Sequence, residues 1–137
     1  MNGDIWVIDG SAFVKLIKIE AESDELREWV RQRPCVSSAL LRTEARRAVA
    51  GEDAHVRQLC EQRLVETHLL EITSSILDAA GRIPGRGLRS LDAIYLACAL
   101  EIGDDLAGLV SYDHRQLAAA AALDIPTVSP GANSGGD

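Results

Sequence analysis

Short apolar runs alternate with amphipathic stretches along most of this chain. Apolar runs of strand length lie at 4–8, 35–37, 68–72, 106–112 and 126–128. Helical spacing of apolar side chains, or a cap followed by such spacing, covers 12–18, 24–31, 40–49, 53–65, 74–81, 91–102 and 115–123. Strands that alternate with helices favour an α/β fold, with a mostly parallel central sheet of four or five strands and helices on both faces.

One predicted helix, over 91–102, has an especially regular apolar stripe. The stripe consists of Leu91, Ile94, Tyr95, Cys98 and Ile102. This spacing predicts that one face of the helix is buried against the rest of the fold.

Four carboxylates lie where an α/β fold gathers its binding sites. Asp9 ends the first predicted strand and Asp113 follows the fourth, so both belong at the carboxyl edge of the sheet. Glu44 and Asp92 lie near the starts of two helices, which face the same edge if they run antiparallel to the strands. Like charges at close range disfavour one another's ionised forms, so such a cluster needs a cationic partner. Mg²⁺ or Mn²⁺ prefers carboxylate oxygens and suits this role.

Each acid also has a simpler structural explanation. Asp9 and Asp113 precede helices, where aspartate is a common N-cap, and Asp92 complements the helix dipole from the first turn. Glu44 lies beside a predicted buried stripe and can be a boundary residue. Periodicity and spacing therefore leave both interpretations open, and only the joint placement of the four acids favours a site.

Composition restricts the class of protein. A chain of 137 residues is long enough for one α/β domain with its own core and too short for two. No apolar stretch reaches the roughly 18 residues of a membrane helix, and the start lacks a signal peptide, so we expect a cytoplasmic protein with no membrane partner. The three cysteines form no C-x-x-C pair, which predicts neither a disulfide framework nor a zinc site. The net charge of -7 is unusual for a phosphate binder, but bound divalent cations reverse the local sign.

Three blocks of the sequence carry a family pattern. They read VIDGSAFVKL near the start, SSALLRTEARRAV in the middle and SLDAIYLACALEIGDDLAGLVSYDHRQLAAAAALDIPTVSP near the end. The last block is the most specific, because an aspartate-bearing helix, a strand ending in S-Y-D and a short helix before a proline follow one another in order. With these blocks the chain resembles the PIN-domain ribonucleases, and in particular the VapC-type toxins of bacterial toxin-antitoxin pairs.

The resemblance implies a PIN-like three-layer fold over residues 1–130, and the Gly-, Ser- and Asn-rich composition of residues 131–137 predicts a flexible tail after it. It also implies which residues form the site. The family's acidic catalytic and metal-site positions correspond to Asp9, Glu44, Asp92 and Asp113. Of these, the first three are the firmer metal ligands, whereas Asp113 can act through a bound water.

Two serines and two departures complete the comparison with the family pattern. Ser11 and Ser111 match hydroxyl residues that support the site. Gly10 stands where the family often has threonine, which predicts a looser turn at the first aspartate. Asp124 replaces a glycine that commonly ends the last helix, and aspartate tolerates the left-handed conformation that such a position needs.

By resemblance, the protein is an endoribonuclease toxin that hydrolyses RNA phosphodiester bonds with a water activated by Mg²⁺ or Mn²⁺. The family pattern further implies a homodimer, held inactive by a small antitoxin that covers the active site. Three arginines, Arg82, Arg86 and Arg89, bracket the loop before Asp92, and we expect them beside the cleft as RNA phosphate contacts. A solvated basic loop remains the simpler explanation for any one of them.

Other classes of α/β protein lack their motifs here. A receiver domain needs an acidic pair after the first strand and a late lysine, but Asp9 is followed by Gly10 and the only lysines are Lys15 and Lys18. A nucleotide-binding Rossmann unit is excluded by the absence of G-x-G-x-x-G and G-x-x-x-x-G-K after a strand. A PIN-like protein that works mainly by binding RNA or its partner stays open as the alternative.

Overall fold

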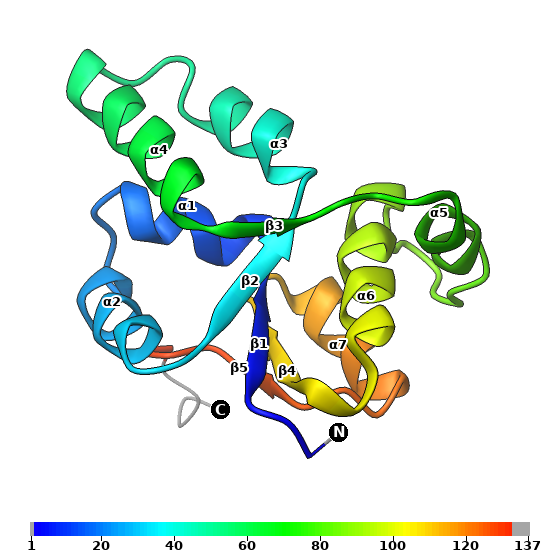
Figure 1. The fold of residues 1–137 in the computed structure, drawn as a ribbon. Coiled ribbons are helices and arrows are strands. Elements are labelled where there is room, and N and C mark those ends of the chain that lie inside the picture. The colour runs from blue at the N-terminus through cyan, green and yellow to red at the C-terminus, as the bar shows by residue number, and fades with distance from the viewer. Residues whose placement is uncertain (1, 133–137) are drawn as a thin grey trace.

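The computed structural model describes residues 2–132, and its helices and strands alternate as predicted (Figure 1). The strands are β1 (Ile5–Ile8), β2 (Cys35–Ser38), β3 (His68–Leu70), β4 (Leu106–Val110) and β5 (Thr127–Val128). The helices are α1 (Gly10–Ile17), α2 (Ser23–Arg31), α3 (Leu41–Ala48), α4 (Ala54–Glu66), α5 (Ser74–Gly81), α6 (Ser90–Ile102) and α7 (His114–Ala122), with a 3₁₀ turn η1 (Gly103–Asp105). Most of the tail expected at 131–137 lies outside the described residues.

The sheet has five parallel strands in the order β3-β2-β1-β4-β5. This confirms the predicted α/β class with a parallel sheet. The chain builds outward from β1 through β2 to β3, and then crosses over to begin the other half at β4. The strand order therefore reverses between β1 and β4, and in open α/β sheets the crevice outside that point is where ligands bind.

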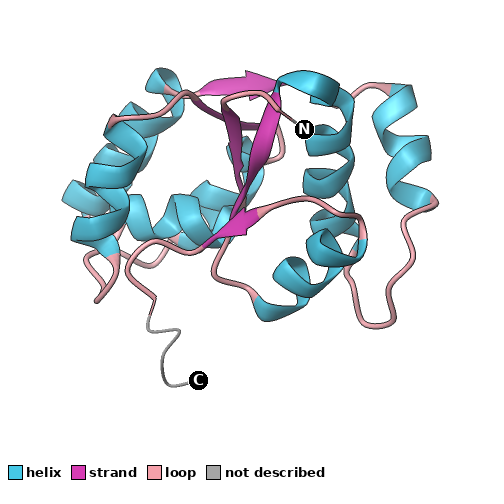
Figure 2. Cartoon of the chain, turned by 90° about the horizontal axis from the view of Figure 1, so that it is seen from below, coloured by secondary structure: helices cyan, strands magenta, loops and turns pink. Residues whose placement is uncertain are grey.

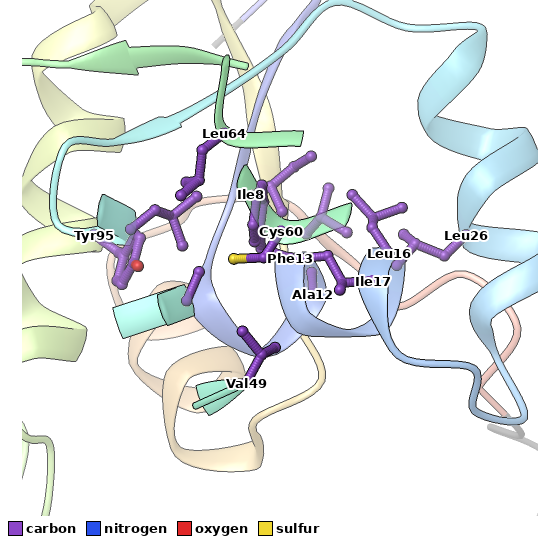
Figure 3. Packing of buried hydrophobic residues seen from close by; sticks show 13 residues of the cluster. Ile8, Ala12, Phe13, Leu16, Ile17, Leu26, Val49, Cys60, Leu64 and Tyr95 are labelled. Atoms are coloured by element: carbon purple, nitrogen blue, oxygen red, sulfur yellow. The ribbon is translucent and has the colours of Figure 1, made fainter. Parts of the chain in front are cut away.

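Helices cover both faces of the sheet, which gives three layers (Figures 1 and 2). Helices α1 to α4 lie on one face, where Ile8 and Phe13 of α1 belong to one buried cluster (Figure 3). Val110 of β4 is part of the same cluster. Helices α5 to α7 lie on the other face, where Val7 and Leu109 pack in a second cluster. Successive strand residues thus point to opposite faces, and both faces of this central pair of strands are buried.

Polar caps begin several of the helices at the positions that the sequence suggests. Asp53 accepts a hydrogen bond from the backbone N–H of Val56 at 3.0 Å, and Thr73 accepts one from Ile76 at 3.2 Å. After α7, Asp124 adopts a positive φ of 60°, so it fills the left-handed position where the family has glycine.

The buried surface of α6 is wider than its apolar stripe predicts. Leu91 belongs to the predicted stripe but is 44% exposed, whereas Ala93, Ala97 and Ala99 outside the stripe are buried. The prediction is wrong at Leu91 because α6 packs against α5 on one side and against the sheet on another. Small alanine side chains allow α6 to approach both α5 and the sheet closely. The apolar spacing in the sequence did not indicate that these alanines are buried.

The cysteines and the helix lengths agree with the class of protein that the composition indicates. All three cysteines are free; Cys60 and Cys98 are buried in the core, and Cys35 is half-buried. Within residues 2–132, the helices all fall short of the length and apolarity that a membrane crossing requires.

Candidate acidic active site

A cleft of about 730 Å³ opens at the carboxyl edge of the sheet, beside the ends of β1 and β4. Its lining includes the four predicted acids, each from a separate segment: Asp9 follows β1, Glu44 lies on α3, Asp92 lies on α6 and Asp113 precedes α7. A fifth acid, Glu20 between α1 and α2, also lines it. The structure therefore brings all four predicted acids into one cleft.

Asp9 is the most deeply buried of the four acids, at 3% exposure. Its Oδ1 accepts hydrogen bonds from Ser11 Oγ at 2.7 Å and from the backbone N–H of Ala12 at 3.0 Å, and its Oδ2 accepts one from Ser111 Oγ at 2.5 Å. Burial raises the pKa of Asp9 to about 6, and the hydrogen bonds from Ser111 and Ser11 oppose that rise. Three donors hold the carboxylate, so the looser turn expected from Gly10 is not observed.

Both predicted supporting serines connect the end of β1 to the end of β4. The backbone N–H of Tyr112 donates to Ser11 Oγ at 2.9 Å, and that of Asp113 donates to Ser111 Oγ at 3.1 Å. The two hydroxyl oxygens are 3.4 Å apart. The serines therefore fix Asp9 and the turn that leads to Asp113 as one unit.

Glu44 lies in the first turn of α3, where a tyrosine from α6 holds it. Tyr95 donates its hydroxyl hydrogen to Oε1 of Glu44 at 2.7 Å. Burial, together with the negative charge of Glu44, raises the pKa of Tyr95 far above its ordinary value, so this hydroxyl stays a donor at neutral pH. Tyr95 was predicted only as a core residue. The sequence feature that could have indicated a site role is its spacing of three residues from Asp92, which places both side chains on one face of α6.

Asp92 presents an unsatisfied oxygen in the first turn of α6. Its Oδ2 is buried and has no hydrogen-bond partner among residues 2–132. Arg89 Nε lies 3.5 Å from this oxygen, which is too long for a good hydrogen bond, and the arginine side chain is 67% exposed. A buried carboxylate oxygen without a partner carries a desolvation cost, so this atom is suited to a bound cation.

Asp113 caps α7, as its simpler explanation predicts. Its Oδ1 accepts hydrogen bonds from the backbone N–H groups of Arg115 at 2.9 Å and Gln116 at 3.3 Å. Its Oδ2 lies 3.6 Å from Nη2 of Arg89. Asp9 likewise caps α1 through Ala12. Each of these two aspartates therefore caps a helix and also lines the cleft.

Three cationic side chains line the same cleft. Of the three loop arginines predicted to lie beside it, Arg89 is among the lining residues, whereas Arg82 and Arg86 are exposed outside the lining. The other two cations are Lys15, which was not predicted as a site residue, and Arg47, one of three arginines on the Glu44 helix that the sequence left open as either RNA contacts or surface residues. Their signal is helical spacing, because Lys15 lies four residues after Ser11 and Arg47 lies three residues after Glu44.

Lys15 is held at the rim by two acids outside the cluster. Its Nζ lies 3.0 Å from Glu22 Oε1 and 3.4 Å from Glu20 Oε1, and it stands over the ring of Tyr112. The ammonium group is therefore partly neutralised in the structure, although it remains at the edge of the cleft.

The cleft has the donor chemistry of a hard divalent cation. Among residues 2–132, no set of three or more His, Cys, Asp or Glu side chains is already arranged around a metal position. Mg²⁺ does not require such a cage, because it usually keeps several waters and takes only one or two protein carboxylates. The buried, unpartnered Oδ2 of Asp92 and the fixed carboxylate of Asp9 supply that kind of ligand.

Comparison with known sequences gives matches along almost the whole chain. The family model described as PIN domain matches residues 6–123. Ribonuclease VapC46 of Mycobacterium tuberculosis is 42% identical over 124 residues, which cover 90% of this chain and 95% of that protein. Ribonuclease VapC35 of the same species is 39% identical over 129 residues, which cover 90% of this chain and 96% of that protein.

Solved structures of toxins share the fold at low sequence identity. The sarcin-ricin loop cleaving toxin VapC20 of Mycobacterium tuberculosis aligns with a TM-score of 0.70 and 16% identity, covering 91% of this chain and 99% of that one. A toxin-antitoxin complex from Klebsiella pneumoniae aligns with a TM-score of 0.67 and 19% identity, covering 90% and 96%. These structures support the three-layer fold described above.

Proposed function

Because this chain belongs to the PIN-domain family and matches VapC ribonucleases over nine-tenths of its length, we propose that it is an endoribonuclease that acts as the toxin of a toxin-antitoxin pair. The resemblance seen in three blocks of the sequence is confirmed by these matches. The finer parts of the proposal are dependence on Mg²⁺ or Mn²⁺, the roles of the four acids, and the partners.

The observation that carries the proposal is the convergence of four carboxylates, from four segments, on one cleft at the switch point of the sheet. Like charges that lie close together cost a fold stability, and Asp92 Oδ2 in addition lacks a hydrogen-bond partner in the part of the chain that the structure describes. A cation that compensates this charge gives the arrangement a physical reason. The carboxylate chemistry favours Mg²⁺ or Mn²⁺ over softer metals.

The residues of the cleft have distinct tasks in this proposal. Asp9, Glu44 and Asp92 would hold the cation, with Asp9 fixed by Ser11 and Ser111. When bound, the cation supplies activation of water and compensation of the charge that develops on the scissile phosphate.

Asp113 has a more peripheral task, because one of its oxygens already caps α7. Its remaining oxygen faces Arg89 and can accept a hydrogen bond from a water in the cleft. This agrees with the expectation that Asp113 acts through water and not as a direct ligand.

RNA would reach the acids along the cationic rim of the cleft. Lys15, Arg47 and Arg89 are the lining residues that can contact phosphate oxygens. Such contacts position the backbone of the RNA without selecting its sequence. Binding should therefore weaken as salt concentration rises, in spite of the net charge of -7.

The partner in this proposal is a small antitoxin that covers the cleft. A basic segment of that protein can pair with the carboxylates that otherwise hold the metal, which would block both the cation and the RNA. Solved toxin-antitoxin complexes among the structural neighbours support this partner class. A homodimer and a cytoplasmic location belong to the same proposal.

The proposal is tested by incubating antitoxin-free protein with total RNA, in Mg²⁺ or in EDTA, and mapping the new RNA ends. We expect cuts at defined positions with Mg²⁺ and none with EDTA. RNA that is bound but left intact in Mg²⁺ and in Mn²⁺ would support the alternative, a PIN-like protein that works by binding alone.

A further inference from the structure

Tyr95 reaches the acidic cleft from within the core. Its side chain is 1% exposed, and its ring belongs to the buried cluster formed with α1, α3 and α4 (Figure 3). The helix that carries it, α6, packs against the sheet and against α5. The ring therefore spans from α6 to the helices of the other layer, at the edge of the sheet where the four acids gather. Close packing on all sides fixes the position of its hydroxyl group.

The hydroxyl meets Glu44 in the space directly above Gly10. Tyr95 donates to Oε1 of Glu44 at 2.7 Å, and a Cβ atom at Gly10 would lie 2.3 Å from that same oxygen and 3.5 Å from the tyrosine hydroxyl. The φ angle of Gly10 is not in the left-handed region, so its backbone conformation is open to other residues. With glycine at this position, the Glu44 carboxylate occupies the space directly beside Asp9, and a larger residue would have to displace it.

We propose that Tyr95 is a positioning residue for Glu44, which holds one carboxylate oxygen in the space above Gly10 and leaves the other for a cation bound with Asp9 and Asp92. This inference rests on the proposed metal-dependent function and concerns how one ligand of that site is kept in place. Tyr95 itself would not touch the metal or the RNA.

The need for such a holder follows from the length and charge of Glu44. A free glutamate side chain samples several rotamers, and fixing it costs conformational free energy when a ligand binds. The other acids that line the cleft carry the same charge, so a Glu44 carboxylate without a donor would be repelled toward solvent. A rigid buried donor opposes both effects before the metal arrives. Partners of metal ligands in other proteins change metal affinity by roughly 10- to 100-fold when they are removed.

The test is Mn²⁺ binding without RNA, measured by isothermal titration calorimetry on the wild type and on Tyr95→Phe. Phenylalanine keeps the packed ring and removes only the hydroxyl. We expect the Kd for Mn²⁺ to rise by about tenfold in Tyr95→Phe. The matched control is Tyr112→Phe, because the hydroxyl of Tyr112 donates to the carbonyl oxygen of Pro130 and not to a carboxylate. Circular dichroism melting shows whether each variant is folded.

A second variant, Gly10→Ala, should disrupt the same hydrogen bond by displacing its acceptor, the Glu44 carboxylate. Its methyl group would push Glu44 Oε1 away from Tyr95 and leave the tyrosine hydroxyl in place. We expect a rise in the Kd for Mn²⁺ similar to that of Tyr95→Phe. In the double variant the two effects should not add, because both remove one shared interaction.

Different variants test the positioning role of Tyr95 and the metal site itself. Unchanged or tighter Mn²⁺ binding in a folded Tyr95→Phe protein would overturn the positioning role. If Tyr95→Phe fails to fold, unchanged Mn²⁺ binding in Gly10→Ala would overturn it. If the positioning role is overturned, loss of Mn²⁺ binding in Asp92→Asn would still uphold the metal site. Wild-type Mn²⁺ binding in Asp92→Asn would contradict both.

Discussion

At the scale of single residues, the cleft contains the carboxylate of Asp9, whose ionised form is disfavoured by its burial. Asp9 is almost inaccessible to solvent, and burial raises its pKa to about 6 against hydrogen bonds from Ser11 and Ser111. The ordinary value in an unfolded chain is 3.8. Asp9 therefore binds a proton more tightly in the folded protein than in the unfolded one, as long as no cation is present.

This difference predicts how the stability of the metal-free protein depends on pH. The contribution of Asp9 is fully present below pH 3.8 and is lost as the pH rises through 6, because the folded state must then give up its proton in a buried place. The difference amounts to about 3 kcal/mol of unfolding free energy. Urea unfolding of the wild type and of Asp9→Asn, compared in metal-free buffer between pH 4 and pH 7, measures it. If the difference between the two proteins does not change with pH, the buried Asp9 charge has no such cost.

At the scale of helices and strands, four helix starts surround the cleft. Asp9 and Asp113 cap α1 and α7, while Glu44 and Asp92 lie in the first turns of α3 and α6. The positive ends of four helix dipoles thus face the acids and offset part of their repulsion. Both interpretations of the acids from the sequence, as caps and as a site, therefore describe the same arrangement.

The elements were more predictable from the sequence than the side chains of the site. Apolar spacing and caps placed the helices and strands within a few residues, because those signals are local. The acids of the site were identified by their order in the family pattern. Tyr95 and Lys15 were not predicted as site residues, and Arg47 was left open as either an RNA contact or a surface residue, because their roles depend on side chains of other elements that no local pattern encodes.

The loop before α6 gives a prediction at the same scale. Arg89 lines the cleft and Arg86 does not, so Arg89→Ala should weaken RNA binding whereas Arg86→Ala should not. Loss of one phosphate contact should also reduce the slope of log Kd against log salt by about 0.7. Filter binding of single-stranded RNA to Asp92→Asn proteins that carry each change provides the measurement without cleavage. Equal weakening by both changes would place the RNA on the whole loop and not in the cleft.

At the scale of the whole molecule, metal binding and folding should be coupled. The cleft joins both halves of the sheet and both helical layers, so a cation bound there stabilises only the folded chain. At a concentration 100 times its Kd, such a ligand adds about 2.7 kcal/mol to the free energy of unfolding.

This coupling predicts that Mg²⁺ or Mn²⁺ raises the melting temperature of the wild type but not that of Asp92→Asn. The metal-free variant should be at least as stable as the wild type, because one of the four like charges gathered in the cleft has been removed. Melting curves in EDTA and at increasing Mn²⁺ concentrations check both statements. A lower melting temperature for the variant in EDTA would show that Asp92 stabilises the metal-free fold, and would contradict this prediction.

If the gathered carboxylates cut RNA, the initial rate of cleavage in Mg²⁺ must depend on Asp92, and this rate can be measured for Asp92→Asn. The matched control is Asp124→Asn, an exposed aspartate outside the cleft whose left-handed position asparagine also accepts. We expect cleavage to be abolished in Asp92→Asn and to continue at the wild-type rate in Asp124→Asn. Cleavage by Asp92→Asn at the wild-type rate would contradict the assignment of this cleft as the active site.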